Sequence, residues 1–293
     1  MYLAAMKYSI RSWRMKYCET LAGSHSKDES EALFSTVLET VTGLSRVNQV
    51  VRQEEIPTEA HEAVFLATLE ALEAGQPLQY ILKRAYFYDL LLNVDSRVLI
   101  PRPETEELVQ LMLHDLPKDT LASILDIGTG SGCIPIALKK NRPLARVFAV
   151  DISEDALALA RENANEQETE IEFFKVDILS HSTASFPWSK LDVIVSNPPY
   201  VPASEKIDMA RHVLEHEPHL ALFVDDEDPL LFYRRIARFA KEQLKKGGRL
   251  YFEIHADFGK DTVDLLASEG FQHVLLVKDL SGRDRLIRCV FNS

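Results

Sequence analysis

The sequence has few cysteines, no long apolar run and no excess of positive charge. Only three of its 293 residues are cysteine, and Cys18, Cys133 and Cys289 lie far apart along the chain. This spacing excludes a CxxC-type zinc site and a disulfide framework, and it favours free thiols in a reducing, cytoplasmic compartment. No segment approaches the ~20 apolar residues of a membrane-spanning helix. The formal net charge of −12 disfavours nucleic acid as the main partner.

Signals for secretion and for metal binding are also lacking. The first residues, Met1 to Trp13, include Lys7 and Arg11 and have no long apolar core, so we expect no secretory signal. Met6 is an alternative start. The nine histidines show no HxxxH or similar spacing, so we expect no metal site.

The first 84 residues have the apolar spacing of helices. Residues 28–44 and 58–74 carry apolar side chains every three or four positions, the period of an amphipathic helix. Thr58 is suited to cap the second of these helices and Gly75 to end it. No strand pattern interrupts this region, which therefore predicts a small all-α domain.

The next segment changes to a strand pattern. Apolar residues over 87–94 and again over 98–100 flank Asp95-Ser96-Arg97, which predicts a β-hairpin that turns at residues 95–97. Pro101 and Pro103 then lead into a predicted helix from about Glu104 to His114.

From Leu121 onward, short apolar strands alternate with helical segments. This alternation predicts an α/β fold with a parallel, doubly wound sheet. The last two strands are joined by a short turn over 279–284, so we expect the final strand to insert antiparallel. The expected strands are 123–127, 146–150, 171–175, 191–196, 249–254, 273–277 and 285–291, and the expected helices are 134–140, 154–166, 230–246 and 260–269.

A glycine-rich turn follows the first of these strands, with the sequence Asp126-Ile127-Gly128-Thr129-Gly130-Ser131-Gly132. Three glycines let the backbone turn sharply and approach a ligand closely. The turn lacks the Gly-Lys-Ser/Thr ending of a phosphate-binding loop, and Cys133 stands where a dinucleotide fingerprint has a small residue. Ligands of open α/β sheets bind beyond the carboxyl ends of the strands, so the turn predicts a cofactor site.

Two acidic residues follow neighbouring strands and narrow the choice of cofactor. Asp151 ends the second strand, where its carboxylate can bind ribose hydroxyls, and Asp177 follows the third strand, where it can accept from the exocyclic amine of adenine. Either acid alone could instead cap a helix or lie in a solvated loop. Together with the glycine turn, they favour an adenosyl cofactor without phosphates.

A second motif, Asn197-Pro198-Pro199-Tyr200, comes directly after the apolar strand 191–196. Proline has no backbone N–H, so two prolines in a row end the strand, and a strand stop is the alternative interpretation. The oxygen of the Asn197 side chain and the carbonyl of Pro198 can accept both N–H bonds of a planar amide, on which Tyr200 can pack. The stretch therefore predicts a clamp for a flat, NH2-bearing group.

These motifs resemble a known family. The glycine turn with Asp151 resembles class I S-adenosylmethionine-dependent methyltransferases, and the clamp is similar to that of enzymes that methylate adenine N6, guanine N2 or glutamine amides. Three further stretches resemble the HemK/PrmC family: Pro-Leu-Gln-Tyr-Ile at 77–81, Val-Leu-Ile-Pro-Arg-Pro-Glu-Thr-Glu at 98–106, and Glu-Pro-His-Leu-Ala-Leu at 217–222. The resemblance covers roughly residues 75–290. It implies N5-methylation of the glutamine in the Gly-Gly-Gln motif of peptide chain release factors.

The resemblance also implies an architecture and a set of site residues. We expect a helical substrate-recognition domain over 1–84, a hairpin linker over 85–102, and a seven-stranded class I methyltransferase (Rossmann-like) domain over 103–293. S-adenosylmethionine is the expected cofactor and a release factor the expected partner of a monomer, without a membrane or a direct nucleic-acid partner. A ribosomal-protein glutamine or a nucleic-acid amino group stays open as the acceptor. The expected cofactor-binding residues are Asp126, Gly128, Thr129, Gly130, Ser131, Gly132, Asp151, Ile152, Asp177, Ile178 and Asn197. The expected substrate-binding residues are Asn197, Pro198, Pro199 and Tyr200, with Asn197, Pro198 and Tyr200 catalytic.

Some segments depart from the family pattern or allow two interpretations. Residues 224–228 are acidic where the family commonly has glycines, and His255 stands where a glycine is usual. Arg102 and Glu104 either brace the hairpin against the cofactor site or start a helix. A basic run predicts a solvated helix face more readily than a binding patch, and it comprises Arg234, Arg235, Arg238, Lys241, Lys245 and Lys246.

Overall fold

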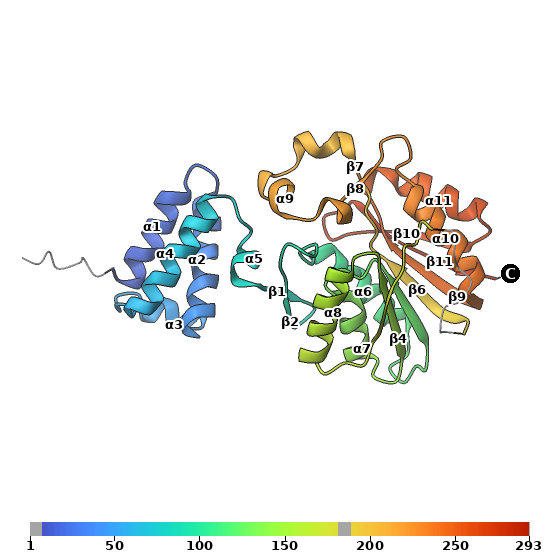
Figure 1. Cartoon of the computed structure of the whole chain (residues 1–293), viewed down its shortest axis with the longest axis horizontal. Helices are drawn as coiled ribbons and strands as arrows, with labels where there is room; N and C mark the ends of the chain where they lie inside the picture. Colours follow the sequence, from blue (N-terminus) through green and yellow to red (C-terminus); the bar gives the residue numbers. More distant parts are fainter. Residues whose placement is uncertain (1–7, 181–188, 293) are drawn as a thin grey trace, which may run out of the picture. The chain divides into compact units, whose positions relative to one another are not determined.

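The computed structural model describes residues 8–180 and 189–292, so the alternative start Met6 lies outside the described residues. The chain divides into two compact units (Figure 1). One unit runs to Lys83 and takes in Arg211–His216, and the other comprises Arg84–Ala210 and Glu217–Ser293. Within the described residues, no helix combines the length and apolarity that crossing a membrane requires.

The first unit is helical, as predicted. Thr58 caps its fourth helix by accepting a hydrogen bond from the His61 N–H, and Gly75 follows that helix with a positive φ of 87°. Buried aromatic and aliphatic side chains form its core, where the Tyr17 hydroxyl donates to the Phe65 carbonyl over 2.7 Å. Its helices are α1 (Ile10–Leu21), α2 (Lys27–Thr42), α3 (Arg46–Val51), α4 (Glu59–Glu73), α5 (Leu78–Leu82) and, from the later segment, α9 (Arg211–His216).

The second unit opens with a hairpin whose turn was predicted in the wrong place. Strands β1 (Arg84–Phe87) and β2 (Leu90–Asn93) pair antiparallel around Tyr88 and Asp89, and residues 95–100 form no strand. Both turn residues have positive φ, 46° and 62°, as a tight two-residue hairpin turn requires. Neither is glycine or asparagine, so the usual sequence signal is missing. The Glu106 side chain stabilises the turn by accepting from the Tyr88 N–H over 3.0 Å.

The predicted seven-stranded sheet is present, with strand order β10-β11-β9-β6-β3-β4-β5. The five strands from β9 to β5 run parallel, and β11 lies antiparallel between β9 and β10, as expected of the final strand. The strands are β3 (Ser123–Ile127), β4 (Arg146–Asp151), β5 (Glu172–Lys175), β6 (Leu191–Ser196), β9 (Leu244–Glu253), β10 (Gln272–Lys278) and β11 (Asp284–Phe291).

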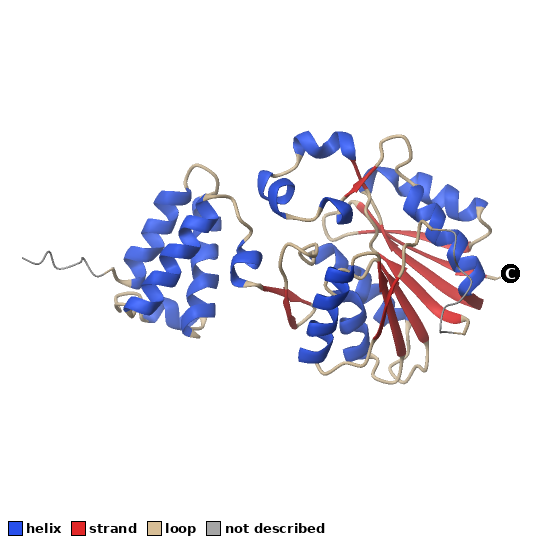
Figure 2. Cartoon of the chain, in the orientation of Figure 1, coloured by secondary structure: helices blue, strands red, loops and turns tan. Residues whose placement is uncertain are grey.

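Helices cover both faces of this sheet (Figure 2). Alternate strand residues face opposite layers: Ile124 and Val193 pack with α6 and α7, whereas Leu125 and Ile194 pack with α10 and α11. This period of two buries both faces of the central strands. The helices are α6 (Pro103–Asp115), α7 (Cys133–Asn141), α8 (Glu154–Glu166), α10 (Leu231–Gln243) and α11 (Gly259–Ser268).

The structure differs from the sequence-based expectations at two places in this unit. The helix expected over 230–246 ends at Gln243, because Leu244 is buried and pairs with Leu191 as the first residue of β9. A short parallel pair of strands, β7 (Val201–Pro202) and β8 (Phe223–Val224), was not predicted. The loop that this pair closes contains α9 and the short 3₁₀-helices η1 (Ala203–Asp208) and η2 (His219–Ala221), and a third, η3 (Ala256–Phe258), follows β9.

Candidate active site

The carboxyl ends of neighbouring parallel strands meet around one cavity of about 220 Å³. Ile127, the last residue of β3, pairs with Ser196 of β6 on one side and with Val150 of β4 on the other. The glycine turn and the clamp therefore begin side by side, at the edge where open α/β sheets bind ligands. Three of the predicted site residues, Asp126, Gly132 and Tyr200, do not line the cavity. The predicted residues that line it are Gly128, Thr129, Gly130, Ser131, Asp151, Ile152, Asp177, Ile178, Asn197, Pro198 and Pro199.

The three glycines of the turn all have positive φ, but they serve two purposes. A Cβ on Gly130 would meet no described atom within 4 Å, and one on Gly128 would meet only the Asn197 carbonyl oxygen, at 4.0 Å. These two glycines leave open space along the cavity wall. A Cβ on Gly132 would lie 3.2 Å from the Cβ of Ala160, so Gly132 allows the turn to pack against α8.

Asp151 holds the glycine turn in place. Its two carboxylate oxygens accept hydrogen bonds from the backbone N–H groups of Gly130 and Ser153, each over 2.9 Å. The N-cap of α8 is Ser153, whose hydroxyl accepts from the Ala156 N–H, so Asp151 is not the capping residue. Burial raises the pKa of Asp151, although these backbone donors oppose the shift.

Asp126 lies at the end of β3 and is fully buried. Neither of its carboxylate oxygens has a hydrogen-bond partner among the described residues, and the same holds for the Thr129 hydroxyl. Burial raises the pKa of Asp126 to about 7, the nearby Thr129 hydroxyl opposes this shift, and the Asp151 charge adds to it. An unpartnered buried carboxylate is costly. A cation or a hydrogen-bond donor beside the turn would offset this cost.

Asp177 and Ile178 line the cavity from the loop after β5. This loop is held from outside the cavity by Arg235 on α10, whose guanidinium donates to the Ile178 carbonyl over 2.9 Å and to the Ser180 carbonyl. Arg235 was predicted only as part of a solvated basic face. Its contacts instead support the cavity wall.

The clamp residues occupy the cavity wall opposite the end of β4, and Tyr200 has a different environment. Asn197, Pro198 and Pro199 line the cavity, whereas Tyr200 does not. The Asn197 Nδ2 donates to the Thr105 hydroxyl over 3.2 Å. The Tyr200 hydroxyl donates to Glu253 Oε1 over 3.0 Å, which holds its ring beside the clamp.

Glu253 and the side-chain role of Thr105 were not predicted from the sequence. Glu253 ends β9 and is 1% exposed, and its Oε2 accepts from the Thr105 hydroxyl over 2.7 Å. Burial raises the pKa of Glu253. A signal was available, because a single carboxylate at the end of the apolar run Leu250-Tyr251-Phe252 is unusual in a buried strand.

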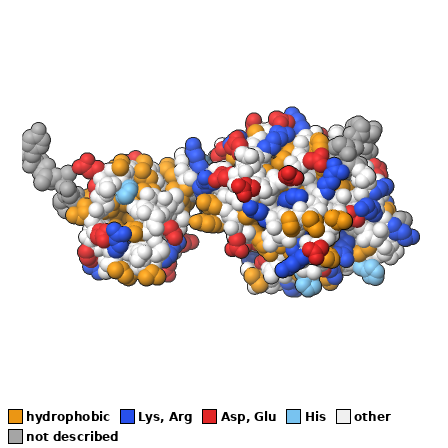
Figure 3. All heavy atoms as spheres, turned by 90° about the horizontal axis from the view of Figure 1, so that it is seen from below, with side chains coloured by type: hydrophobic (Ala, Val, Ile, Leu, Met, Phe, Trp, Pro, Cys, Tyr) orange, Lys and Arg blue, Asp and Glu red, His pale blue; other side chains and the backbone are white. Residues whose placement is uncertain are grey.

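Four of the other basic residues of this run, three on α10 and Lys245 on β9, form ion pairs within the unit. Arg234 pairs with Asp228, Arg238 and Lys241 share Glu269, and Lys245 pairs with Asp192. On the face of the larger unit in Figure 3, basic and acidic side chains are interspersed. Four cations of the predicted basic run are thus held in ion pairs, and its interpretation as a solvated face stays a prediction.

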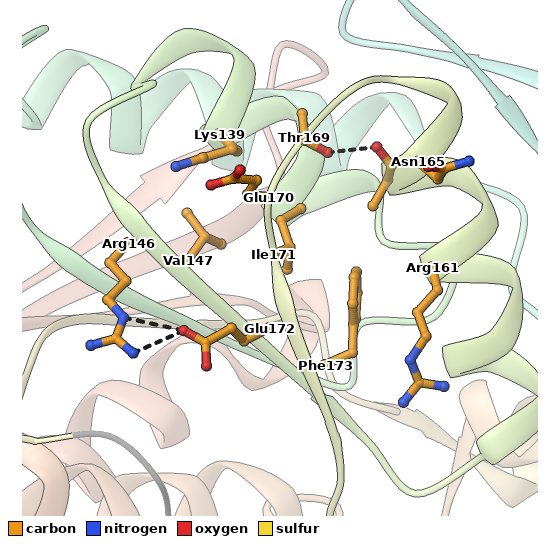
Figure 4. A pocket seen from close by; sticks show the side chains of 11 residues that line it. Lys139, Arg146, Val147, Arg161, Asn165, Thr169, Glu170, Ile171, Glu172 and Phe173 are labelled. Carbon is orange, nitrogen blue, oxygen red and sulfur yellow. Dashed lines mark hydrogen bonds and ion pairs between the residues drawn. The ribbon is translucent and has the colours of Figure 1, made fainter.

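A larger open hollow of about 520 Å³ lies at the other edge of the sheet (Figure 4). Arg146 and Glu172, at the starts of β4 and β5, face each other there and form an ion pair of 2.9 Å. Lys139 donates to two backbone carbonyls, and Arg161 pairs with Glu154. These cations already have partners, so the hollow is a weaker candidate for the active site.

Two family models match the chain, one described as the methyltransferase small domain over residues 105–222 and one as the PrmC N-terminal domain over residues 13–82. A release factor glutamine methyltransferase of Flavobacterium psychrophilum is 43% identical over 285 residues, which cover 96% of this chain and 99% of the relative. One of Bacteroides thetaiotaomicron is 40% identical over 269 residues, covering 92% and 95%. The chain belongs to the release factor glutamine methyltransferase family.

Solved structures bear out the fold of this methyltransferase family member. A methyltransferase from Pyrococcus furiosus covers 80% of this chain and 100% of its own, with a TM-score of 0.51 and 14% identity. The T. thermophilus 16S rRNA N2 G1207 methyltransferase, solved with AdoMet and guanosine, has the same score and identity and covers 71% of this chain and 50% of its own. At this identity the likeness shows the fold alone, and it agrees with the predicted class I methyltransferase sheet.

Two motif stretches of the family meet at the cavity of this methyltransferase. Arg102 pairs with Glu217 over 2.6 Å, and the other oxygen of Glu217 accepts from the Ile100 N–H. Arg102 thus braces the segment before α6, while Glu104 lies in the first turn of α6. His255, which stands where the family usually has glycine, contacts Glu205 over 3.2 Å. In the acidic stretch over 224–228, the Asp226 carboxylate accepts a hydrogen bond from the Ser204 N–H.

Proposed function

We propose that this protein transfers a methyl group from S-adenosylmethionine to the side-chain nitrogen (N5) of the glutamine in the Gly-Gly-Gln motif of peptide chain release factors. The observation that carries the proposal is that the Asn197–Pro198 clamp and the glycine turn line one cavity. A methyl donor at the turn and a planar amide in the clamp would therefore be neighbours. Relatives that match nearly the whole chain carry the name of this activity.

The residues of the cavity fit the cofactor. Gly128 and Gly130 leave room beside the backbone, and Asp151 presents a carboxylate for ribose hydroxyls. Asp177 would accept from the adenine amine. Asp126 does not line the cavity, but its buried oxygens at the end of β3, beside the turn, would suit the cationic amino group of the methionine part. Ile152 and Ile178 supply apolar wall on either side. When bound, S-adenosylmethionine supplies an electrophilic methyl group that needs no acid catalyst.

The clamp would act by orienting the acceptor amide. An amide nitrogen is a weak nucleophile because its lone pair is delocalised, so alignment with the methyl carbon is the main requirement. The Oδ1 of Asn197, which has no partner in the part of the chain that the structure describes, and the Pro198 carbonyl would each accept one N–H. Both acceptors also stabilise positive charge that builds on the nitrogen in the transition state. The Tyr200 ring would pack against the plane of the amide.

The predicted domains divide the work in this proposal. The helical domain, residues 1–84, recognises the protein substrate, residues 85–102 link it, and residues 103–293 bind the cofactor and transfer the methyl group. The match of the PrmC N-terminal domain model over 13–82 supports this division. The enzyme would act as a monomer in the cytoplasm, where its substrate works.

The decisive experiment supplies labelled S-adenosylmethionine with three acceptors: a release factor, a ribosomal protein and duplex DNA. We expect label in the release factor, and none after its Gly-Gly-Gln glutamine is replaced. Label that survives this replacement would reject the proposed site of methylation. Label only in the ribosomal protein or only in DNA would assign the clamp to another planar amino group.

A further inference from the structure

A hydrogen-bond chain of four side chains in the second unit joins Glu253 to Tyr200 directly and to Asn197 through Thr105. The Thr105 and Tyr200 hydroxyls lie 2.7 and 3.0 Å from the two carboxylate oxygens of Glu253. Thr105 Oγ1 also lies 3.2 Å from the Nδ2 of Asn197. Thr105 is 2% and Glu253 1% exposed, so water does not compete for these groups.

We propose that Glu253 is a positioning residue, which determines through Thr105 which end of the Asn197 side-chain amide faces the substrate. The inference rests on the proposed function for the identity of the acceptor amide.

The direction of each hydrogen bond follows from the chemistry of the carboxylate. An ionised carboxylate only accepts hydrogen bonds, so Thr105 must donate its hydroxyl proton to Glu253. Thr105 Oγ1 then has only lone pairs to offer to its other neighbour. The atom of Asn197 beside it must therefore be the NH2 group, and Oδ1 is left to face away from Thr105.

This orientation decides whether the clamp can bind an amide nitrogen. The acceptor NH2 group has two N–H donors, which require two acceptors. With Oδ1 presented, Asn197 and the Pro198 carbonyl supply both. With the amide turned over, the Asn197 NH2 would meet the substrate NH2, donor against donor. The chain also polarises the Asn197 amide, because successive hydrogen bonds that end on a negative charge strengthen one another.

The charge of Glu253 is set by groups on several elements. Burial and Glu104 raise its pKa, whereas the Thr105 and Tyr200 hydroxyls and the Arg285 guanidinium oppose the shift. The Tyr233 hydroxyl also packs here and donates to the Glu253 backbone carbonyl over 3.4 Å. A protonated Glu253 could donate to Thr105 and free the Thr105 proton for Asn197 Oδ1. Turnover at saturating cofactor should therefore fall as pH falls through the raised pKa of Glu253.

The test compares Thr105→Val, which keeps the shape and loses the hydroxyl, with Thr105→Ser, which keeps the hydroxyl. We expect Thr105→Val to lower kcat for the release factor by about 10- to 100-fold. This loss is at most that expected when one acceptor that stabilises the transition state is removed outright. The dissociation constant for S-adenosylmethionine should stay unchanged, and Thr105→Ser should recover most of the turnover. Glu253→Gln should lower kcat similarly, because a neutral amide has one acceptor oxygen and accepts from only one hydroxyl. It should also remove the acid limb of the pH profile of kcat, because an amide does not titrate.

Tyr251→Phe is the matched control. Tyr251 lies on the same strand and donates its buried hydroxyl to Asp115 over 2.9 Å, away from the cavity. We expect this variant to retain wild-type kcat and pH profile. An equal loss of kcat in Thr105→Ser and Thr105→Val, or in Tyr251→Phe and Thr105→Val, would overturn the proposal.

A second readout needs no substrate. The side-chain amide signals of Asn197, assigned in the 15N spectrum by their loss in Asn197→Ala, should shift in Thr105→Val and return in Thr105→Ser. Unmoved signals in Thr105→Val would overturn the proposal even if kcat falls. If the wild-type protein labels no release factor, the proposed function fails while this spectrum still tests the chain from Glu253 to Asn197.

Discussion

The backbone N–H of Gly130 donates a hydrogen bond to Asp151 Oδ2 over 2.9 Å. The contact joins the turn after β3 to the end of β4, so the acid expected at the ribose also shapes the cavity wall. The other carboxylate oxygen of Asp151 accepts a hydrogen bond from the Ser153 N–H at the start of α8. Asp151 therefore couples cofactor binding to the geometry of the glycine turn.

Replacement of Asp151 by asparagine should weaken cofactor binding. The amide has one acceptor oxygen and cannot keep both backbone hydrogen bonds. Loss of a charge-assisted hydrogen bond costs ~1.5–3 kcal/mol, so the dissociation constant for S-adenosylmethionine should rise about 10- to 100-fold by calorimetry. Asp192→Asn is the control, since that carboxylate also accepts a backbone N–H, from Ser123 over 2.8 Å, but lies outside the cavity. Equal losses in both variants would contradict the assignment.

Asn197→Ala should slow methyl transfer without affecting the cofactor. Removal of one acceptor that stabilises the transition state costs about 3 kcal/mol, which corresponds to about a 100-fold lower kcat. Single-turnover measurements with release factor check the rate, and calorimetry checks cofactor binding. Near-wild-type turnover with unchanged cofactor affinity would remove Asn197 from the mechanism.

Asp126→Asn should make the cofactor-free protein more stable and bind the cofactor less tightly. Burial raises the pKa of Asp126 from 3.8 to about 7, which corresponds to about 4 kcal/mol. A raised folded-state pKa contributes stability that is present below pH ~4 and lost as pH rises through about 7. The variant should therefore gain unfolding free energy at pH 8 and little at pH 4, as measured in urea. A gain that is independent of pH would refute the role of this carboxyl group.

Arg235→Lys should weaken cofactor binding through the loop that carries Asp177. A lysine cannot donate to the Ile178 and Ser180 carbonyls in the geometry of the guanidinium. The dissociation constant for the cofactor should rise about 10-fold, and the KM for the release factor should not change. Arg238→Lys, on the same helix but paired with Glu269, serves as the control. Loss of affinity in the control alone would contradict the support role of Arg235.

Where local sequence carried a turn signal, the predictions agree with the structure. Thr58 and Gly75 bound α4 because a capping hydroxyl and a positive-φ glycine act within a few residues. The hairpin turn was misplaced because Tyr88 and Asp89 carry no such signal, and a distant acceptor on Glu106 stabilises their strained backbone. Likewise, α10 ends at Gln243 because Leu244 pairs with Leu191 in the sheet, a contact that helix propensity does not include.

The motifs that determine the chemistry are short and contiguous, so the sequence was enough to predict the glycine turn, the clamp and the strands that carry them. The carboxyl ends of these strands meet because parallel strands of one sheet share an edge. The alternation of strands and helices along the chain already implies this. The support of the clamp is different, because Thr105 and Glu253 are 148 residues apart and meet only when α6 packs beside the end of β9. A hydrogen bond between such residues depends on the packing of the whole unit. No local pattern of residues could predict it.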